Sequence, residues 1–390
     1  MAEAKDPLKN GDQEKPVQKI GIKRGIEPDK PQDLAPDQVQ DRRGRPVYLA
    51  RPKWRIPPWI IALVVFVALM AGLFVVVPLL VDQASDFDDP QTPGFSQSDQ
   101  GQALLQNADL AVVKVASAPL LDAPHARAVR LAEALFNEMV TIVDSQSRDY
   151  LLVRLQDGVQ GYIRRDHLSA DKLSVVADNA LAKVLVRDAS KRIMSHARQG
   201  SLLVEAPMGT VLYADYRNGD LLRVRLPDQT SGWINSSGVI LLPPQASIGA
   251  EDNWDQLLVA SMMTFIQSPQ VPGGVTRRGI SMEGALYVSG RLNGLTLTRD
   301  RQALMSMGQA VSLPLDDQGA RDLTYLAEGD LVFFHEKYDQ QAIRALAIRV
   351  TDDQLLLGLP NKSKLQLMDL ESSQAKELAQ AIMTARRFDP

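Results

Sequence analysis

The spacing of hydrophobic and polar residues changes along this chain, and each change marks a different kind of element. Residues 59–81 form one uncharged apolar run, whereas residues 108–243 alternate apolar and polar side chains in short stretches. Residues 253–266 place apolar side chains three to four positions apart. Alternation is typical of half-buried strands, and the wider spacing is typical of an amphipathic helix. The pattern therefore predicts an apolar helix, then an all-β region, then a mixed α and β region.

The apolar run is long enough to cross a bilayer as a helix, which takes about 20 residues. Basic residues precede it without an acid among them, and acidic residues follow it at positions 82, 86, 88 and 89. Because basic flanks stay on the cytoplasmic side, we expect a single-pass transmembrane helix over residues 57–81 in the inner membrane. The N-terminus is then cytoplasmic and the C-terminal domains are periplasmic. A cleaved signal peptide fits less well, because no A-x-A pattern follows the run.

Two polar segments flank the predicted helix. Residues 1–56 are rich in Lys, Asp, Gln and Pro, and cannot bury enough apolar surface to fold. We expect them to form a disordered cytoplasmic tail. Residues 82–107 are acidic and rich in turn-forming residues, which is typical of a linker.

The all-β region contains two similar units, at residues 108–171 and 179–244. Each has strand-like stretches separated by turns and ends in a glycine, an aromatic residue and an isoleucine, Gly161-Tyr162-Ile163 in one and Gly232-Trp233-Ile234 in the other. A repeat of this length predicts two copies of one small β unit. The pattern resembles bacterial SH3-like domains, and this resemblance implies two small barrels that bind rather than catalyse. Tyr162 and Trp233 are then either ligand-stacking residues or core aromatics.

The C-terminal region, residues 248–390, resembles the papain-like cell-wall peptidases of the NlpC family. The resemblance rests on blocks in the same order: VPGG at 271–274, GISMEG at 279–284, LTRD at 297–300, GQAVSL at 308–313 and LAEGDLVFF at 326–334. It implies an α+β papain-like (NlpC-type) domain. The predicted fold class is thus a membrane-anchored multidomain protein, with one transmembrane helix, two SH3-like barrels and this domain.

The same resemblance implies a catalytic triad whose positions are vacant here. The family uses a cysteine nucleophile, and this chain has no cysteine. The resemblance places Met282 at the nucleophile position, Ala345 at the histidine position, and Leu357 or Leu359 at the third polar position. We therefore predict a degenerate peptidase domain with no catalytic residues, in which these apolar side chains pack together.

A substitute nucleophile is the alternative to a vacant site. Ser281 precedes Met282, and His335 directly follows the LVFF stretch. A serine immediately before a helix is more simply explained as an N-cap, because its hydroxyl accepts a hydrogen bond from the first turn. Residues 372–387 are predicted to form one further helix, with Ser372 or Ser373 as its cap.

Charge and composition limit the remaining functions. The net charge is −4, which gives no argument for binding nucleic acid. The four histidines are scattered, so neither a metal site nor another cofactor is expected. Arg277, Arg278 and Arg299 lie near the vacated nucleophile position, and they form either the basic rim of a retained binding cleft or an ordinary solvated face.

These observations predict a non-catalytic, membrane-anchored envelope protein. Its extracytoplasmic domains would bind cell wall or partner proteins, as a scaffold or as a regulator of an active hydrolase. The expected partners are the inner membrane, peptidoglycan and other envelope proteins. Two alternatives stay open. One is a cell-wall peptide hydrolase with an atypical nucleophile, and the other is a membrane-tethered sensor or assembly factor whose cytoplasmic tail contacts the partner.

Overall fold

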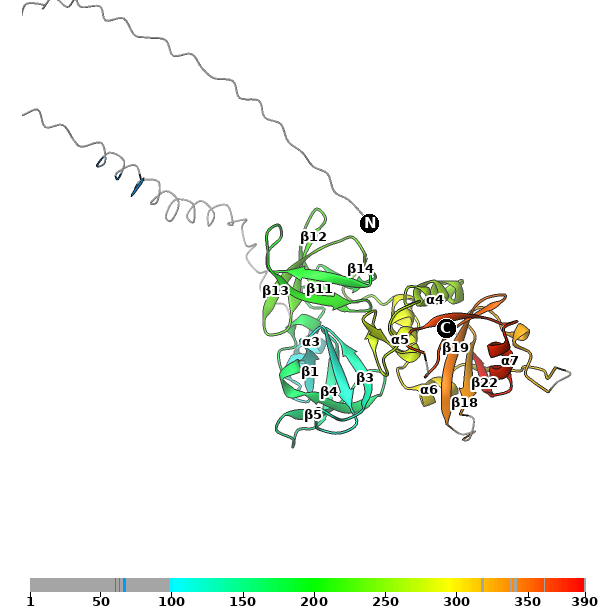
Figure 1. Ribbon diagram of the computed structural model, residues 1–390. Helices are drawn as coiled ribbons and strands as arrows, with labels where there is room; N and C mark the ends of the chain where they lie inside the picture. Colours follow the sequence, from blue (N-terminus) through cyan, green and yellow to red (C-terminus); the bar gives the residue numbers. More distant parts are fainter. Residues whose placement is uncertain are drawn as a thin grey trace, which may run out of the picture. The chain divides into compact units, whose positions relative to one another are not determined.

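A computed structural model describes residues 98–316, 319–336, 339, 342–360 and 362–388, together with residues 60, 63, 66 and 67. The chain divides into two units, Met1–Asp88 and Asp89–Pro390. Figure 1 shows the elements of the second unit, which contains three folded parts. The predicted tail at residues 1–56 and the first part of the predicted linker, residues 82–97, lie outside the described residues.

The membrane-anchored fold class is corrected. Among the described residues, no helix is long and apolar enough to span a membrane. Ile60, Leu63, Phe66 and Val67 are helical, and the rest of the predicted span lies outside the described residues. The prediction of a membrane-spanning helix rested on the length of the uncharged run at residues 59–81. Length alone does not require that such a run forms one continuous helix.

The first β domain, residues 110–169, is a seven-stranded sheet in the order β3-β2-β6-β5-β4-β1-β7. Along β6, Gly161 and Ile163 are buried and their neighbours are not, which is the alternation read from the sequence. The buried side chains of the strands form one core cluster that includes Val113, Leu120 and Val153. The strands are β1 (Leu110–Val113), β2 (Ser117–Leu121), β3 (Arg130–Leu135), β4 (Met139–Asp144), β5 (Tyr150–Arg154), β6 (Gln160–Arg164) and β7 (Leu168–Ser169).

The second β domain, residues 182–242, repeats this topology. Its strand order is β10-β9-β13-β12-β11-β8-β14, which is the first order with each strand advanced by seven. Identical strand order in consecutive segments is what an internal repeat predicts. The strands are β8 (Ala182–Val186), β9 (Ser190–Met194), β10 (Leu202–Pro207), β11 (Val211–Asn218), β12 (Leu221–Leu226), β13 (Thr230–Asn235) and β14 (Val239–Leu242).

Short helical segments adjoin the two β domains. Helix α3 (Asp99–Gln106) lies within the predicted linker and begins at its N-cap, Ser98. The Ser98 backbone N–H also donates to Asp178 Oδ2, at 2.8 Å, so this end of the linker is held against the connection between the β domains. The 3₁₀ turn η2 (Arg165–His167) lies between β6 and β7, and η3 (Leu173–Val175) lies in the connection between the two β domains.

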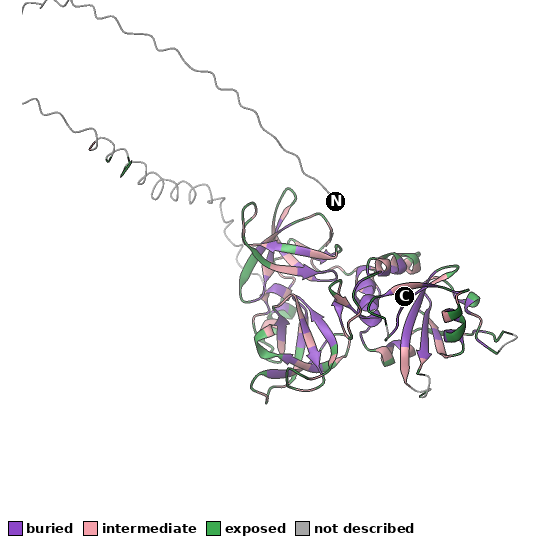
Figure 2. Ribbon diagram, viewed as in Figure 1, coloured by how far each residue is buried: buried purple, intermediate pink, exposed green. Residues whose placement is uncertain are grey.

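The C-terminal domain is a six-stranded antiparallel sheet, in the order β17-β22-β18-β19-β20-β21, with helices on both faces. Figure 2 shows that its central strands are buried. Helices α4 and α5 share one core cluster with one face of the sheet, and α7 shares a second cluster with the other face. The helices are α4 (Trp254–Met263), α5 (Met282–Leu292), α6 (Arg301–Ser306) and α7 (Ser373–Ala379), with the 3₁₀ turn η4 (Leu323–Tyr325). The six strands are β17 (Gln309–Val311), β18 (Leu331–His335), β19 (Ile343–Thr351), β20 (Gln354–Gly358), β21 (Gln366–Asp369) and β22 (Ile382–Arg387). A separate two-stranded sheet consists of β15 (Val275–Thr276) and β16 (Gly279–Ile280).

The last predicted helix is wrong in its second half. Ser372 caps α7 as expected, but the helix ends at Ala379 and residues 382–387 form β22. This strand lies between β17 and β18 and pairs with both. A strand with partners on both sides satisfies its backbone by tertiary pairing, and such pairing overrides a local helical preference.

Candidate functional site

The N-terminus of α5 carries the position that the resemblance assigns to the nucleophile. Ser281 has an extended backbone and is the N-cap, because the Gly284 N–H donates to its Oγ at 3.0 Å. The Ser281 backbone N–H donates to the Gly274 carbonyl at 2.9 Å, which fixes the approach to the helix. The predicted capping role of Ser281 is confirmed. Its hydroxyl oxygen is therefore already engaged in holding the first turn of the helix.

Met282, the next residue, is buried in the apolar cluster between α5 and the sheet. Leu346 of β19 belongs to the same cluster and pairs in register with Gly358 of β20. A Cβ atom added to Gly358 would lie 3.0 Å from Met282 Cγ, Leu365 Cδ2 and Gln270 Nε2, so this glycine leaves space for all three side chains. A flexible thioether suits such an irregular gap.

The predicted cluster of Met282 with Ala345, Leu357 and Leu359 does not form. The latter three belong to the core cluster on the opposite face of the sheet, which α7 covers. Successive side chains of a strand point to opposite faces, so an alignment that is wrong by one residue exchanges the two faces. Directly after Ala345 and Leu357 in the two strands, Leu346 and Gly358 lie on the Met282 side, and Ile348 and Leu356 belong to the same cluster as Met282.

The proposed substitute pair, Ser281 and His335, is not brought together by any of the contacts of the described residues. The hydroxyl of Ser281 caps α5, and its remaining contact is with the Gly274 carbonyl at 3.4 Å. His335 Nδ1 lies 2.7 Å from the Glu336 carbonyl oxygen. Among the described residues, no group of three or more side chains suited to bind a metal ion occurs.

The first β domain covers the loop that leads to α5. Gly273 has a φ of +68°, and a Cβ atom there would lie 2.7 Å from the Leu131 carbonyl oxygen of β3. Only a glycine permits this backbone conformation together with so close an approach. The Val275 N–H donates to Glu133 Oε2 at 3.3 Å. Burial raises the pKa of Glu133, although the nearby Arg130 opposes the shift.

Arg299, predicted to line a basic rim, is buried in the contact with the first β domain. Its side chain is only 2% exposed. Its Nη2 lies 2.6 Å from Glu138 Oε1, and its Nε lies 2.8 Å from Asp157 Oδ2. Its Nη1 donates to the Glu133 carbonyl at 2.7 Å and to Glu138 Oε2 at 3.1 Å, and its Nη2 donates also to Asp157 Oδ1. All five N–H groups of the guanidinium are therefore used, and none is left for a ligand.

The aromatic ring of Tyr287 completes this cluster. The Arg299 guanidinium carbon lies 3.8 Å from the ring centroid, which is cation–π geometry. The Tyr287 hydroxyl donates to Glu138 Oε1 at 3.1 Å and accepts from Arg291 Nη1 at 2.9 Å. Burial raises the pKa of Tyr287 to about 12. Burial is the largest influence on Glu138 and alone would raise its pKa. The charge and hydrogen bonds of Arg299, the charge of Arg291 and the Leu135 N–H together outweigh burial, so the pKa of Glu138 lies below its ordinary value.

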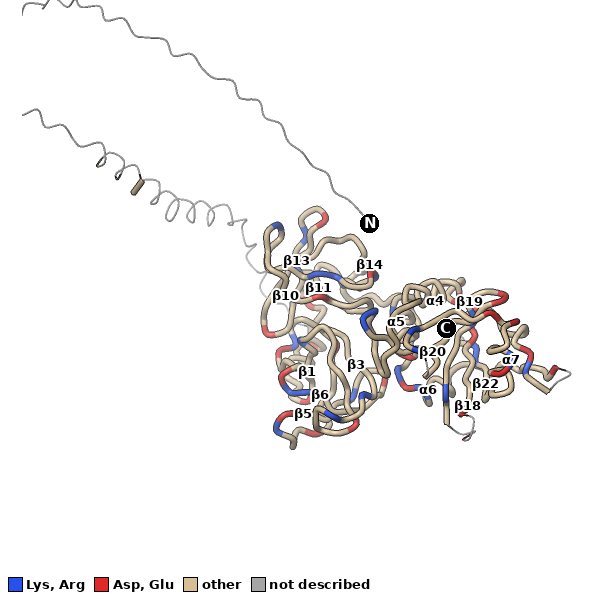
Figure 3. The backbone as a smooth tube through the Cα atoms, in the orientation of Figure 1, with Lys and Arg blue, Asp and Glu red and all other residues tan. Residues whose placement is uncertain are grey.

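The other two predicted rim residues do not join Arg299. Arg277 and Arg278 are both exposed, and Arg278 forms an ion pair with Glu205 of the second β domain. Figure 3 shows basic and acidic residues interspersed over the folded parts. These three arginines therefore do not form the predicted basic rim. Arg299 and Arg278 pair instead with acidic residues of the two β domains, which are distant in the chain.

Tyr162 and Trp233 occupy equivalent strands, β6 and β13, and both are partly exposed. The adjacent Gly–Ile positions face the core in each case. Trp233 packs edge-on against Tyr216, with ring centroids 5.9 Å apart. Neither aromatic lies in the core clusters of the β domains.

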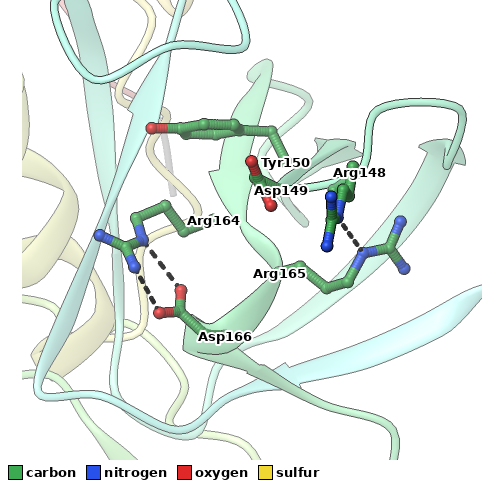
Figure 4. A pocket seen from close by; sticks show the side chains of 6 residues that line it. All are labelled: Arg148, Asp149, Tyr150, Arg164, Arg165 and Asp166. Carbon is green, nitrogen blue, oxygen red and sulfur yellow. Dashed lines mark hydrogen bonds and ion pairs between the residues drawn. The ribbon is translucent and has the colours of Figure 1, made fainter.

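An arginine-lined pocket on the first β domain was not found from the sequence. It has a volume of about 540 Å³ and is lined by the side chains shown in Figure 4. Arg164 pairs with Asp166 through two hydrogen bonds, of 2.9 Å and 2.5 Å. Arg165 donates to the carbonyls of Arg148, Ser145 and Ser147. The sequence feature that could have indicated this pocket is the pair Arg164-Arg165, which directly follows Gly161-Tyr162-Ile163.

Comparisons with known proteins identify the fold. No protein-family model matches the sequence, and no curated protein matches it. An NlpC/P60 family protein from Bacillus cereus is 18% identical, with a TM-score of 0.61, over 72% of this chain and 100% of the other. A novel NlpC/P60 endopeptidase from Photobacterium damselae is 12% identical, with a TM-score of 0.48, over 71% of each chain. NlpC2 from Trichomonas vaginalis is 13% identical, with a TM-score of 0.36, over 73% of this chain and 98% of the other.

The conclusion about the fold of the C-terminal domain rests on the Bacillus cereus structure. Its likeness covers more of this chain than residues 248–390 alone, so it includes part of the β region. At this identity the likeness shows the fold and does not transfer an activity. The C-terminal domain has an NlpC/P60-type fold.

Proposed function

We propose that this protein uses its peptidase-like fold to bind rather than to cleave, as a scaffold or regulator at the cell wall. The main support for this proposal is the apolar environment of Met282. A thiol peptidase needs a thiolate and a neighbouring base, and a thioether has no proton to lose. Met282 is buried beside Leu346 and Gly358, which supply neither a base nor a group to orient one.

The arginine-lined pocket of the first β domain supports a binding role. Arginine guanidinium groups bind carboxylates and phosphates through paired hydrogen bonds. Within the described residues, the exposed Arg148 side chain has no hydrogen-bond or ion-pair partner, and Arg164 has only the exposed Asp166. Wall peptides and anionic wall polymers carry the complementary charges. We propose that the folded parts work outside the cytoplasm, with peptidoglycan or another envelope protein as the partner.

Two measurements on the full-length protein test this function. Incubation with purified peptidoglycan, followed by mass spectrometry of released peptides, should give no product above a protein-free sample. Co-sedimentation with the same peptidoglycan should give saturable binding, weakened in Arg148→Gln/Arg164→Gln. Arg217→Gln, an exposed arginine of the second β domain, is the matched control and should bind as the unaltered protein does.

Two results would reject the proposal. Product release that disappears in Ser281→Ala or His335→Ala would establish a hydrolase with an atypical nucleophile. Absence of binding to peptidoglycan, together with absence of any envelope protein cross-linked to the full-length chain, would remove the binding role.

A further inference from the structure

The charged lining of the arginine-lined pocket is specific to the first of the two β domains. The two domains share one strand order, so the register of their hairpins shows which residues occupy equivalent positions. These pairs are Arg148 and Gly219, Asp149 and Asp220, Tyr150 and Leu221, Arg164 and Asn235, and Arg165 and Ser236. Each of the three arginines has an uncharged residue at the equivalent position, and the second domain still folds with the same topology. The arginines are therefore not needed to form this fold.

The loop between β4 and β5 is longer in the first domain, and Arg165 holds it in place. Residues 145–149 connect these strands, whereas only residues 219–220 connect β11 and β12. Arg165 Nε donates to the Arg148 carbonyl at 3.1 Å, and its Nη2 donates to two more carbonyls of the loop, at 3.2 Å and 3.0 Å. These three bonds fix the guanidinium. Its Nη1 has no partner among the described residues, so two N–H donors stay available in a fixed position.

The same loop carries a positive and a negative side chain next to Arg165. Arg165 contacts the backbone of both residues, because its Nε donates to the Arg148 carbonyl and its backbone N–H donates to the Asp149 carbonyl at 2.9 Å. Both side chains are exposed and line the pocket (Figure 4), and in the described part of the chain neither has a hydrogen bond or an ion pair. In the second domain the equivalent Asp220 accepts from Ser236 Oγ at 3.4 Å. A ligand can therefore reach an unpaired cation and an unpaired carboxylate together.

The charges of the pocket select the kind of ligand. Arg164 donates to Asp166 from Nε and Nη2, so these two charges largely cancel. Arg148 and Arg165 remain as cations, and Asp149 remains as an anion. A ligand with only negative charge would lie near the unpaired carboxylate, and a ligand with only positive charge would lie near two guanidinium groups. A ligand that carries both charges complements all three groups.

We propose that this pocket binds a zwitterionic ligand, in which a short aliphatic chain joins an ammonium group to an oxyanion. The ammonium pairs with Asp149, the oxyanion accepts from Arg165 Nη1, and Arg148 adds positive charge on the same loop. Tyr150, only 9% exposed, supplies an apolar wall for the aliphatic chain. The volume of about 540 Å³ is within the roughly 300–1,000 Å³ typical of small-molecule sites.

This inference rests on the proposed function, because it names the ligand class of the pocket that supports binding there. Amino carboxylates and amino phosphates share the required chemistry. Both occur as free molecules and as charged groups of larger polymers. The oxyanion is therefore a carboxylate or a phosphate, and the probes described next distinguish the two.

Saturation-transfer difference NMR on the full-length protein, at constant ionic strength, tests the site with small probes. The probes are amino carboxylates of increasing length, namely β-alanine, γ-aminobutyrate and ε-aminocaproate, and aminopropylphosphonate, which matches γ-aminobutyrate in spacing. At least one should bind saturably. The matched compound without the amino group and the matched amine without the oxyanion should each bind about threefold to fivefold more weakly, because each loses one exposed charge pair. The tighter of γ-aminobutyrate and aminopropylphosphonate identifies the oxyanion.

Asp149→Asn tests the contact with the ammonium. The Asp149 side chain has no partner to lose among the described residues, so we expect this variant to fold. It should bind the zwitterion and the matched compound without the amino group equally. Asp220→Asn, at the equivalent position of the second β domain, is the matched control and should keep the preference for the zwitterion. Arg148→Gln should weaken both compounds together by about threefold to fivefold.

Three results would overturn the proposal: no saturable binding of any zwitterion, equal binding of compounds with and without the amino group by the unaltered protein, or loss of the preference in Asp220→Asn as well as in Asp149→Asn. Binding of a zwitterion without binding to peptidoglycan would reject the proposed function and leave this site standing. Binding to peptidoglycan that is weakened in Arg148→Gln/Arg164→Gln, with no zwitterion bound, would reject this site and leave the proposed function standing.

Discussion

Replacing Arg299 with methionine should separate the first β domain from the C-terminal domain. The side chain is 2% exposed, and it satisfies two carboxylates whose own side chains are 1% and 5% exposed. Methionine fills similar space over Tyr287 but removes every donor. Glu138 and Asp157 would then be buried, charged and without their main partner.

The size of the effect follows from this burial. Removing one partner of a buried ion pair costs about 3–5 kcal/mol, because the remaining charge stays desolvated. Arg278→Met is the matched control, since Arg278 also pairs with a glutamate of a β domain but is 83% exposed. Exposed pairs contribute about 0–1 kcal/mol. The two substitutions change the same residue type, but Arg299 is buried between two carboxylates, whereas Arg278 is exposed and pairs with one.

Scanning calorimetry at pH 7 measures the comparison. We expect Arg299→Met to lower Tm by several times the change in Arg278→Met. A loss of about 3 kcal/mol corresponds to roughly 6 °C or more for a folded region of about 200 residues. Equal changes in the two variants would refute the reasoning, because they would show that the buried cluster contributes no more than a surface pair.

The pH dependence gives an independent check on the same substitution. In the unaltered protein the pKa of Glu138 lies below its ordinary value, so its stabilising contribution is present above about pH 4.3 and is lost as the pH falls through the folded-state pKa. Without Arg299, burial should raise that pKa instead, and the variant should gain stability as the pH falls. The difference in Tm between the two proteins should therefore narrow from pH 7 to pH 5. A difference that widens would contradict the assignment.

Three further substitutions test other parts of the fold. Gly358→Ala should cost about 1–3 kcal/mol, because its Cβ would press on Met282 Cγ, Leu365 Cδ2 and Gln270 Nε2, and adding Met282→Ala should recover the part of the lost Tm that is due to Met282. Ser281→Ala should cost about 1 kcal/mol of unfolding free energy through loss of the cap of α5, and an unchanged denaturation midpoint would contradict this. Asp330→Asn weakens the pair with Arg387, at 2.6 Å, and should cost about 1–3 kcal/mol. Hydrogen exchange in β22 should then accelerate, whereas unchanged protection there would count against it.

Local patterns predicted much of the fold. The alternation in residues 108–243 gave the strands and their repeat, because each strand buries one face and the two sheets share one strand order. Ser281 was identified as a cap because a serine before an apolar helical pattern has a specific backbone role. These predictions depend on neighbours within a few residues of each position.

Features that depend on distant partners were missed. The faces of β19 and β20 could not be assigned without the register, so Ala345 and Leu357 were placed beside Met282 although they lie on the α7 side. Residues 382–387 read as helix because their strand partners, β17 and β18, are about 50 to 75 residues away in the chain. The long apolar run at residues 59–81 satisfied a criterion of length, and that criterion takes no account of tertiary contacts.

Arg299 shows most clearly why the charged site could not be read from the sequence. Its partners Glu138 and Asp157 precede it by 161 and 142 residues. From the sequence, an arginine near Met282 was expected to line the rim of a binding cleft. In the structure, Arg299 is buried against those two carboxylates and all of its N–H donors are used. The hydroxyl of Tyr287 also links Glu138 to Arg291 within this cluster. Helix α5 therefore carries a buried methionine at its start and, farther along, Tyr287 and Arg291, which connect it to the ion cluster. The start of the helix also carries a buried charge, because Glu283 forms an ion pair there with Arg301.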